Sequence, residues 1–326
     1  MTWIPRSKNW EMPERQATSE QAYMDRRKFV QKLGLAGAGL LSTLSCGNAK
    51  GGDEVDWSAQ TTATPTSDLY PAARNAAFAL DRPLTDEGVA ATHNNFYEFT
   101  TNKDQVHRLV EKFQVRPWQV EVTGLVHKPQ VFDIDELVRQ IPLEERLYRF
   151  RCVEAWAMAV PWTGFPFKAL MDRVQPQTSA RFVRLVTFYN PEQARGQRLE
   201  KWWPWPYYEG LTMEEASNEL TLLTTGIYGH ELPKQHGAPI RLVVPWKYGY
   251  KSIKSIVRIE FVEKRPPTFW NDQAPSEYGF WSNVNPAVPH PRWSQASEKL
   301  IGTGERVPTQ LYNGYGEYVA HLYKKT

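Results

Sequence analysis

The chain has 326 residues, 41% of them hydrophobic and 13% aromatic, a composition that buries a substantial core and excludes disorder throughout. Its net charge of +3 comes from residues 1–50, which hold eight Lys and Arg against four Asp and Glu, and residues 51–326 hold 31 against 32. Because this body is neutral and has no basic run interleaved with aromatics, we expect no nucleic-acid partner.

An arginine pair precedes a short apolar stretch near the N-terminus. Arg26 and Arg27 are followed by Phe29 and by residues 33–44, which are rich in Gly and Ala. This stretch is shorter than the roughly 20 residues of a spanning helix and is typical of a signal-peptide core. We therefore predict that residues 1–50 are a twin-arginine signal peptide, cleaved near residues 46–50. The export machinery for such signals carries folded proteins to the periplasm, which favours a cofactor inserted beforehand.

Two alternatives apply to the same region. It could be an amphipathic surface helix with a chance arginine pair, although Gly34, Gly37 and Gly39 would weaken such a helix. The residues 43–46, Thr-Leu-Ser-Cys, also resemble a lipoprotein cleavage box, and lipidation of Cys46 would then anchor the protein. Thr stands where Leu is usual, so lipidation is the minority interpretation.

The body begins after a segment with many small and polar residues. We predict a flexible linker over residues 51–71 and one catalytic domain over residues 72–326. Apolar alternation and β-branched runs predict strands at 118–122, 130–132, 147–153, 181–188, 240–244 and 255–262. Helices are predicted at 133–139, with a capping box at its start, and at 167–174 and 213–219. Since no regular long helices separate the strands, the expected fold class is α+β, mainly β, rather than a doubly wound parallel sheet.

Cys152 is the residue for which the sequence allows the most chemical roles. The only other cysteine, Cys46, lies beside the predicted cleavage region, so Cys152 has no certain disulfide partner. Two cysteines exclude a four-cysteine iron–sulfur or zinc site. Three interpretations stay open: an inert buried thiol, a nucleophile stabilised by Arg149 or Arg151, and a soft ligand for a transition metal. The seven histidines form no H-E-x-x-H motif, so a histidine zinc site is unsupported.

The surroundings of Cys152 resemble a known family. Residues 149–156 (RFRCVEAW), 160–166 (VPWTGFP), 93–99 (HNNFYEF) and 237–254 (GAPIRLVVPWKYGYKSIK) are similar to segments of the sulfite oxidase fold family. Within it they resemble the periplasmic protein-methionine-sulfoxide reductase catalytic subunits. With the export signal, the resemblance covers nearly the whole chain.

The resemblance implies a sulfite oxidase-type molybdopterin-binding fold with one molybdenum-molybdopterin per chain and Cys152 as metal ligand. The pterin and its phosphate would be held by Asn94, Tyr97, Glu98, Thr187, His236, Arg241, Ser252, Ile253 and Lys254. Arg241 and Lys254 are suited to a phosphate. His236 departs from the family pattern, in which Asn is expected. Glu154 is expected to be either a proton carrier near the metal or a surface carboxylate.

The function implied is reduction of methionine sulfoxide in oxidised periplasmic proteins. Since the sequence contains no haem, flavin or iron–sulfur motif, electrons must come from outside, and the family implies a haem-containing integral membrane subunit as donor. The first alternative is a sulfite oxidase-type or general S-/N-oxide oxidoreductase. Sulfite oxidases usually carry a further C-terminal domain, and the short remainder after residue 262 favours the reductase.

A third hypothesis is an exported, non-catalytic ligand-binding protein. Its support is the segment 202–208 (WWPWPYY), because clustered aromatics can form a recognition surface. We expect this segment to be a loop near the mouth of the active site.

Overall fold

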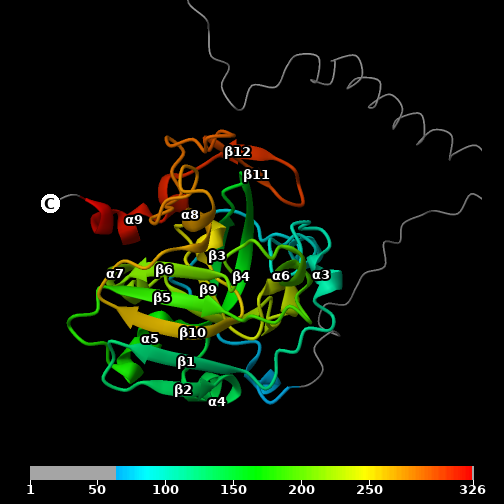
Figure 1. Cartoon of the computed structure of the whole chain (residues 1–326). Helices are drawn as coiled ribbons and strands as arrows, with labels where there is room; N and C mark the ends of the chain where they lie inside the picture. The colour runs from blue at the N-terminus through cyan, green and yellow to red at the C-terminus, as the bar shows by residue number, and fades with distance from the viewer. Residues whose placement is uncertain (1–63, 325–326) are drawn as a thin grey trace, which may run out of the picture. The chain divides into compact units, whose positions relative to one another are not determined.

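Two β-sheets organise the part of the chain that the computed structural model describes, residues 64–324 (Figure 1). All described residues belong to one compact unit of the chain. The predicted signal peptide, Cys46 and the first part of the predicted linker lie outside the described residues. Within residues 64–324, no helix has the length and apolar character needed to span a bilayer.

The first sheet has five strands in the order β2-β1-β10-β5-β6. Its strands are β1 (Gln119–Gly124), β2 (Gln130–Asp133), β5 (Phe182–Thr187), β6 (Tyr208–Thr212) and β10 (Ile256–Val262). In β1, Val120 and Val122 are buried while their neighbours are more exposed, which is the pattern of a strand with one face on the core. β1 runs parallel to β10 and the other pairs are antiparallel, so the sheet is mixed.

The second sheet is built around one long buried strand. Its order is β12-β11-β4-β7-β8, with β3 beside β4 and β9 beside β7. The strands are β3 (Glu144–Arg151), β4 (Trp156–Pro166), β7 (Leu222–Ile227), β8 (His230–Glu231), β9 (Arg241–Val243), β11 (Ser297–Leu300) and β12 (Arg306–Pro308). β4 is buried along almost its whole length, and β3 pairs with it as an antiparallel hairpin.

The helices are short. The α-helices are α2 (Glu87–Ala91), α3 (Val106–Leu109), α4 (Ile134–Gln140), α5 (Phe167–Val174), α6 (Arg195–Leu199), α7 (Met213–Ser217), α8 (Phe269–Gln273) and α9 (Gly316–Val319). The 3₁₀ helices are η2 (Ser67–Leu69), η3 (Lys234–His236), η4 (Gly249–Lys251), η5 (Leu311–Gly314) and η6 (Ala320–Tyr323). α5 buries Phe167, Leu170, Met171 and Val174, the spacing of one apolar helix face.

The predicted fold class, α+β and mainly β, is confirmed. Every strand and helix predicted in the body overlaps an element of the same type, and the helix at 167–174 has the predicted bounds. At Asp133, which begins α4, the carboxylate accepts hydrogen bonds from the amides of Asp135 and Glu136, although the reciprocal half of a capping box is not formed. The strands β4, β6, β7, β8, β11 and β12 were not predicted.

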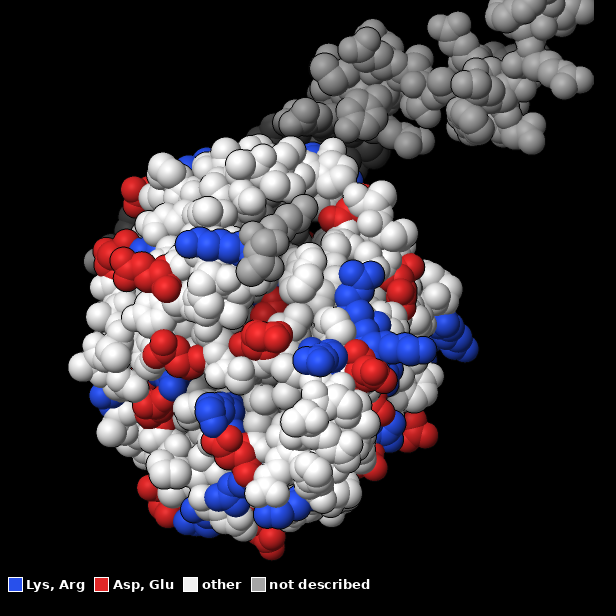
Figure 2. Space-filling model, turned by 90° about the vertical axis from the view of Figure 1, so that its left-hand side faces the viewer, with Lys and Arg blue, Asp and Glu red and all other residues white. Residues whose placement is uncertain are grey.

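Charged side chains are mixed on the face seen in Figure 2. Lysines and arginines alternate there with aspartates and glutamates, and neither sign gathers into a continuous patch. This distribution agrees with the near-neutral composition of the body. A protein face of this kind exerts little net long-range attraction on charged partners.

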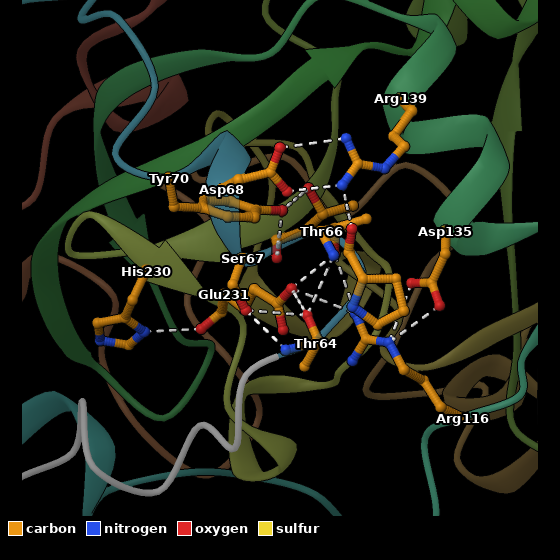
Figure 3. A network of polar contacts seen from close by, with 12 residues as sticks. Thr64, Thr66, Ser67, Asp68, Tyr70, Arg116, Asp135, Arg139, His230 and Glu231 are labelled. Atoms are coloured by element: carbon orange, nitrogen blue, oxygen red, sulfur yellow. Dashed lines mark hydrogen bonds and ion pairs between the residues drawn. The ribbon is translucent and has the colours of Figure 1, made fainter.

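Residues 64–71, expected in the flexible linker, are ordered and attached to the domain (Figure 3). The hydroxyl groups of Thr64 and Thr66 donate hydrogen bonds to Glu231 at β8, and the Thr66–Glu231 distance is 2.6 Å. Arg116 lies 3.3 Å from the same carboxylate. The packed part of the chain therefore already includes residues that the predicted boundary at 71/72 assigned to the linker, because their hydroxyl groups satisfy a buried carboxylate.

Candidate active site

Cys152 occupies the turn that joins β3 to β4. The amide of Cys152 donates to the Trp156 carbonyl at 2.9 Å, and the amide of Ala155 donates back to the Cys152 carbonyl at 3.1 Å. Ala155 has a left-handed φ of 64°, which closes the turn tightly. The two strands thus hold the thiol at a fixed point, and the side chain is buried.

The arginines around this turn are bound elsewhere. Arg151 is fully buried and forms an ion pair with Glu298 at 3.0 Å. Arg149 pairs with Asp81 and donates to Gln310 at 2.6 Å. Both guanidinium groups therefore support the frame of the turn. The charge of Arg151 lowers the pKa of Cys152, but burial outweighs it and raises that pKa to about 12, so the structure does not favour the predicted nucleophile stabilised by Arg149 or Arg151.

A cavity of about 870 Å³ opens beside the thiol. Ten of the eleven predicted site residues line it: Asn94, Tyr97, Glu98, Cys152, Glu154, His236, Arg241, Ser252, Ile253 and Lys254. Thr187 does not line the cavity, because its buried hydroxyl group donates to the Ser255 carbonyl at 2.9 Å and so joins β5 to the start of β10. The segments before β3, around Cys152 and before β10 meet at this cavity although they are distant in sequence.

An aromatic cluster anchors the first of these segments. Phe96 and Phe99 have ring centroids 4.9 Å apart, and Phe99 contacts Phe113 at 5.3 Å. Between these anchored rings, Tyr97 faces the cavity. Asn94 donates from its side-chain amide to the Ala91 carbonyl at 2.8 Å, which ties the segment to the end of α2.

One end of the cavity is basic. Arg241 donates to the carbonyl oxygens of His236 at 2.8 Å and Ser252 at 3.0 Å, and Lys254 donates to the Asn95 carbonyl. Neither cation has a carboxylate within ion-pair distance among residues 64–324. Burial lowers the pKa of Arg241 to about 9, and burial together with the charge of Arg241 lowers the pKa of Lys254.

Two neighbours complete the basic end. Burial and the nearby cations hold the pKa of His236 well below its usual value, so the imidazole is neutral near pH 7. Burial raises the pKa of Glu98, and the charge of Lys254 opposes this effect. Gly237 has a φ of +99°, and a Cβ there would lie 2.5 Å from the side chain of Lys254. Glycine at this position leaves room for the lysine to reach the cavity.

The other side of the thiol carries a carboxylate. Glu154 accepts hydrogen bonds from the Trp156 indole at 2.9 Å and from Asn95 Nδ2 at 3.1 Å, and Lys103 Nζ lies 3.1 Å away. Burial raises the pKa of Glu154, but these three donors outweigh burial and hold the pKa below its usual value. Of the two predicted environments for Glu154, the structure shows a half-buried carboxylate at the cavity rather than a surface one.

The electrostatic surroundings do not stabilise a free thiolate. Burial, followed by the charge of Glu154, raises the pKa of the Cys152 thiol to about 12. Glu154 Oε2 lies 3.9 Å from the sulfur. A thiolate here requires a bound cation such as a metal ion. Among residues 64–324 no three His, Cys, Asp or Glu side chains are placed to hold a metal together, so Cys152 is a single protein donor.

The prediction missed two polar residues beside the thiol. Asn95 Nδ2 lies 3.5 Å from Cys152 Sγ, while Asn95 Oδ1 is buried without a hydrogen-bond partner in the described structure. Lys103 follows the His93–Phe99 segment in a turn. Asn95 lies inside the His93–Phe99 segment, but the sequence pattern does not distinguish it from Asn94 as a site residue. No feature of the sequence identifies Lys103 as a site residue.

The predicted aromatic loop lies beside the cavity. Trp203 contacts Tyr97 with ring centroids 5.7 Å apart, and Trp270 contacts Tyr97 at 5.1 Å. Tyr207 lines the cavity itself. The expectation that residues 202–208 form a loop near the mouth is therefore confirmed for this segment.

This chain is similar to a known domain family, to a curated relative and, more distantly, to a solved structure. The oxidoreductase molybdopterin binding domain family matches residues 107–270. The protein-methionine-sulfoxide reductase catalytic subunit MsrP of Burkholderia mallei is 46% identical over 318 residues, which cover 96% of this chain and 93% of the relative. Among solved structures, the sulfane dehydrogenase SoxCD from Paracoccus pantotrophus is similar with a TM-score of 0.42 and 15% identity, over 73% of this chain and 62% of that one.

Proposed function

The chain belongs to the molybdopterin-binding oxidoreductases and, within them, to the protein-methionine-sulfoxide reductase catalytic subunits, and we propose on this basis that it reduces methionine sulfoxide in proteins to methionine. The observation that carries the proposal is the pairing of one buried thiol with two cations that lack a carboxylate partner, buried Arg241 and half-buried Lys254, across one cavity. The family makes the chain an enzyme rather than a non-catalytic binding protein.

The residues of the cavity fit the molybdenum-molybdopterin cofactor. Arg241 is buried and Lys254 is half-buried, and both are desolvated cations in need of an anion, as a cofactor phosphate supplies. Asn95 Oδ1 is a buried acceptor in need of a donor, and Cys152 is a soft ligand. When bound, the cofactor supplies two-electron oxygen-atom transfer.

The protein's own groups then have separate tasks. Cys152 fixes the metal end of the cofactor to the β3–β4 turn, and Arg241 and Lys254 fix the phosphate end. Glu154 holds Asn95 and Lys103 on the solvent side of the thiol. Reduction of a sulfoxide consumes two electrons and two protons and releases the oxygen as water. Protons enter where Glu154 and Lys103 lie, because this is the open side of the cavity.

The electron donor and the compartment belong to the same proposal. Because no haem, flavin or iron–sulfur motif is present in the sequence, the electrons come from outside the chain, and the resemblance to the reductase catalytic subunits implies a haem-containing integral membrane subunit as the donor. The name of the Burkholderia mallei relative, a catalytic subunit, supports a multi-subunit assembly. Arg26, Arg27 and the apolar stretch after them support export to the periplasm by the twin-arginine machinery. Exchange of both arginines for Lys should leave precursor in the cytoplasm, and normal periplasmic accumulation would refute this route.

The deciding experiment uses purified, molybdenum-loaded protein with an artificial electron donor. We expect conversion of methionine sulfoxide to methionine in an oxidised, unfolded protein and little oxidation of sulfite. The quantity to compare is kcat/KM for the two substrates on one preparation. A ratio that favours sulfite would overturn the reductase assignment, and metal analysis of the same sample checks the cofactor.

A further inference from the structure

A second and wider hollow lies outside the cavity that contains Cys152. It is open to solvent, and the space free of protein atoms within it is about 2200 Å³, part of which is open solvent. Glu154, Trp156 and Tyr97 line both spaces, so the outer hollow leads directly to the thiol. Its volume far exceeds what one methionine side chain fills. The neighbouring residues of a polypeptide substrate therefore have room to lie in it.

The outer hollow is lined by cations without partners. Lys299 on β11, Arg306 on β12 and Arg108 on α3 all line it and are exposed. None of the three forms an ion pair with a carboxylate of the described part of the chain, whereas most charged groups around them do. Exposed, unpaired cations that share one concave surface raise the local concentration of anionic groups.

Cations outnumber carboxylates in the hollow. Glu154 is paired with Lys103 at 3.1 Å. Asp104 lies 3.1 Å from His93, but burial lowers the pKa of His93, so Asp104 keeps its negative charge near pH 7. Five cations, Lys103, Arg108, Arg292, Lys299 and Arg306, face these two carboxylates, and the lining is therefore positive. This differs from the face in Figure 2, where charges of both signs alternate. The concentration of positive charge is a local feature of the mouth.

Aromatic side chains provide the apolar part of the same surface. Trp156, Trp270, Tyr278 and Trp293 line the hollow, and Trp270 and Tyr278 contact each other with ring centroids 5.2 Å apart. Indole and phenol rings bind thioether and aliphatic groups favourably. The mouth therefore combines apolar walls next to the thiol with a positive rim.

We propose that the outer hollow binds the peptide segment on either side of the oxidised methionine and selects segments that carry Asp or Glu beside it. This inference rests on the proposed reductase function and adds a preference within it. The aromatic walls receive the methionine side chain, and Lys299, Arg306 and Arg108 receive the flanking carboxylates. Rim charges of this kind act on association and on specificity more than on the chemical step.

The test uses three unstructured peptides of equal length, each with one methionine sulfoxide flanked by Glu, Gln or Lys. Holoenzyme with an artificial donor should show a kcat/KM that is about tenfold higher for the Glu peptide than for the Lys peptide at low salt. The preference should shrink at about 1 M salt, where the Debye length falls to about 3 Å. Dissociation constants of the reduced peptides, measured by fluorescence anisotropy, should follow the same order.

The variants reverse the rim charge. Lys299→Glu with Arg306→Glu should lose the preference for the Glu peptide and leave turnover of free methionine sulfoxide unchanged. Arg108→Glu, on a separate element, should weaken the preference without altering the β11–β12 hairpin. The matched control is Lys128→Glu with Lys264→Glu, which reverses two exposed charges outside the hollow and should keep the preference.

The outcomes separate the two proposals. Absence of turnover with every sulfoxide would refute the reductase function. Equal kcat/KM for the three peptides in the wild type would overturn the charge preference and leave the reductase function intact. If the rim variants slow only the reaction with the physiological electron donor, the surface belongs to that donor and the inference is wrong. Loss of turnover of free methionine sulfoxide in the Lys299→Glu/Arg306→Glu variant would also overturn the inference, because it would place Lys299 and Arg306 in the catalytic centre.

Discussion

Asn95 donates a hydrogen bond toward the sulfur of Cys152 over 3.5 Å, although 57 residues separate the two in the chain. The same amide nitrogen lies 3.1 Å from the Glu154 carboxylate, and the amide oxygen has no partner in the described structure. One side chain therefore orients the thiol and the acid and still presents a free acceptor to the cavity.

We expect Asn95→Ala to lower kcat/KM for peptide methionine sulfoxide by roughly tenfold, since a hydrogen bond to a charged group contributes about 1.5–3 kcal/mol. The thermal midpoint should also fall modestly, because the variant loses the hydrogen bond from Asn95 Nδ2 to the Glu154 carboxylate. Asn102→Ala, in an exposed turn, is the matched control for loss of an asparagine. Unchanged kinetics in Asn95→Ala would show that the residue does not act on the reacting centre.

Cys152→Ser should fold and lose nearly all reductase activity. Serine preserves the size of the side chain and the β3–β4 turn, whose hydrogen bonds are made by the backbone, but it is a poor ligand for a soft metal site. Circular dichroism, molybdenum content and turnover would be measured on the same sample. Wild-type protein prepared without molybdenum serves as the control, and full activity in the serine variant would remove Cys152 from the metal.

The sequence singled out Cys152 because an unpaired cysteine that follows a predicted export signal calls for a chemical reason. Asn95 and Lys103 could not be found in this way, since their importance comes from contacts made only after folding. Thr187 was assigned by family position alone, and its hydroxyl group serves the sheet instead. β4 was not predicted because a strand that is buried on both faces lacks the alternation of polar and apolar residues by which a strand is recognised in the sequence.

His236 provides a prediction about pH. Its pKa in the folded protein is held well below the usual value, first by burial and then by nearby cations. As pH falls below about 6.5, the unfolded chain therefore binds a proton at this residue that the folded chain does not. Stability is greatest above that pH and decreases toward acid.

The change His236→Asn removes this contribution. Between about pH 7.5 and pH 5.5, the cofactor-free wild type should lose about 1.4 kcal/mol more unfolding free energy than His236→Asn does. Urea unfolding at the two pH values measures the difference. The comparison with the variant cancels the other histidines, and an equal loss in both proteins would mean that His236 is protonated in the folded state.

Lys254 and Lys251 allow the cofactor site to be tested through stability alone. The two lysines are three residues apart. Lys251 is fully buried and lies 2.6 Å from Glu209, whereas Lys254 is half-buried and donates only to a backbone carbonyl among the described residues. Lys254→Met should therefore stabilise the cofactor-free protein by about 1–3 kcal/mol, because it removes a desolvated charge that has no carboxylate counterion. The same variant should retain less molybdopterin, since it removes a phosphate-binding cation.

Lys251→Met is the control, and it should change the free energy of unfolding in the opposite direction. It leaves the Glu209 carboxylate buried without its cation, which should cost about 3–5 kcal/mol of stability, and it removes no group that lines the cavity. Unfolding free energies of both cofactor-free variants and the pterin content of the holoproteins complete the comparison. If Lys254→Met destabilised the cofactor-free protein as much as Lys251→Met, Lys254 would already be compensated by the protein, and the argument that it awaits an anionic group would fail.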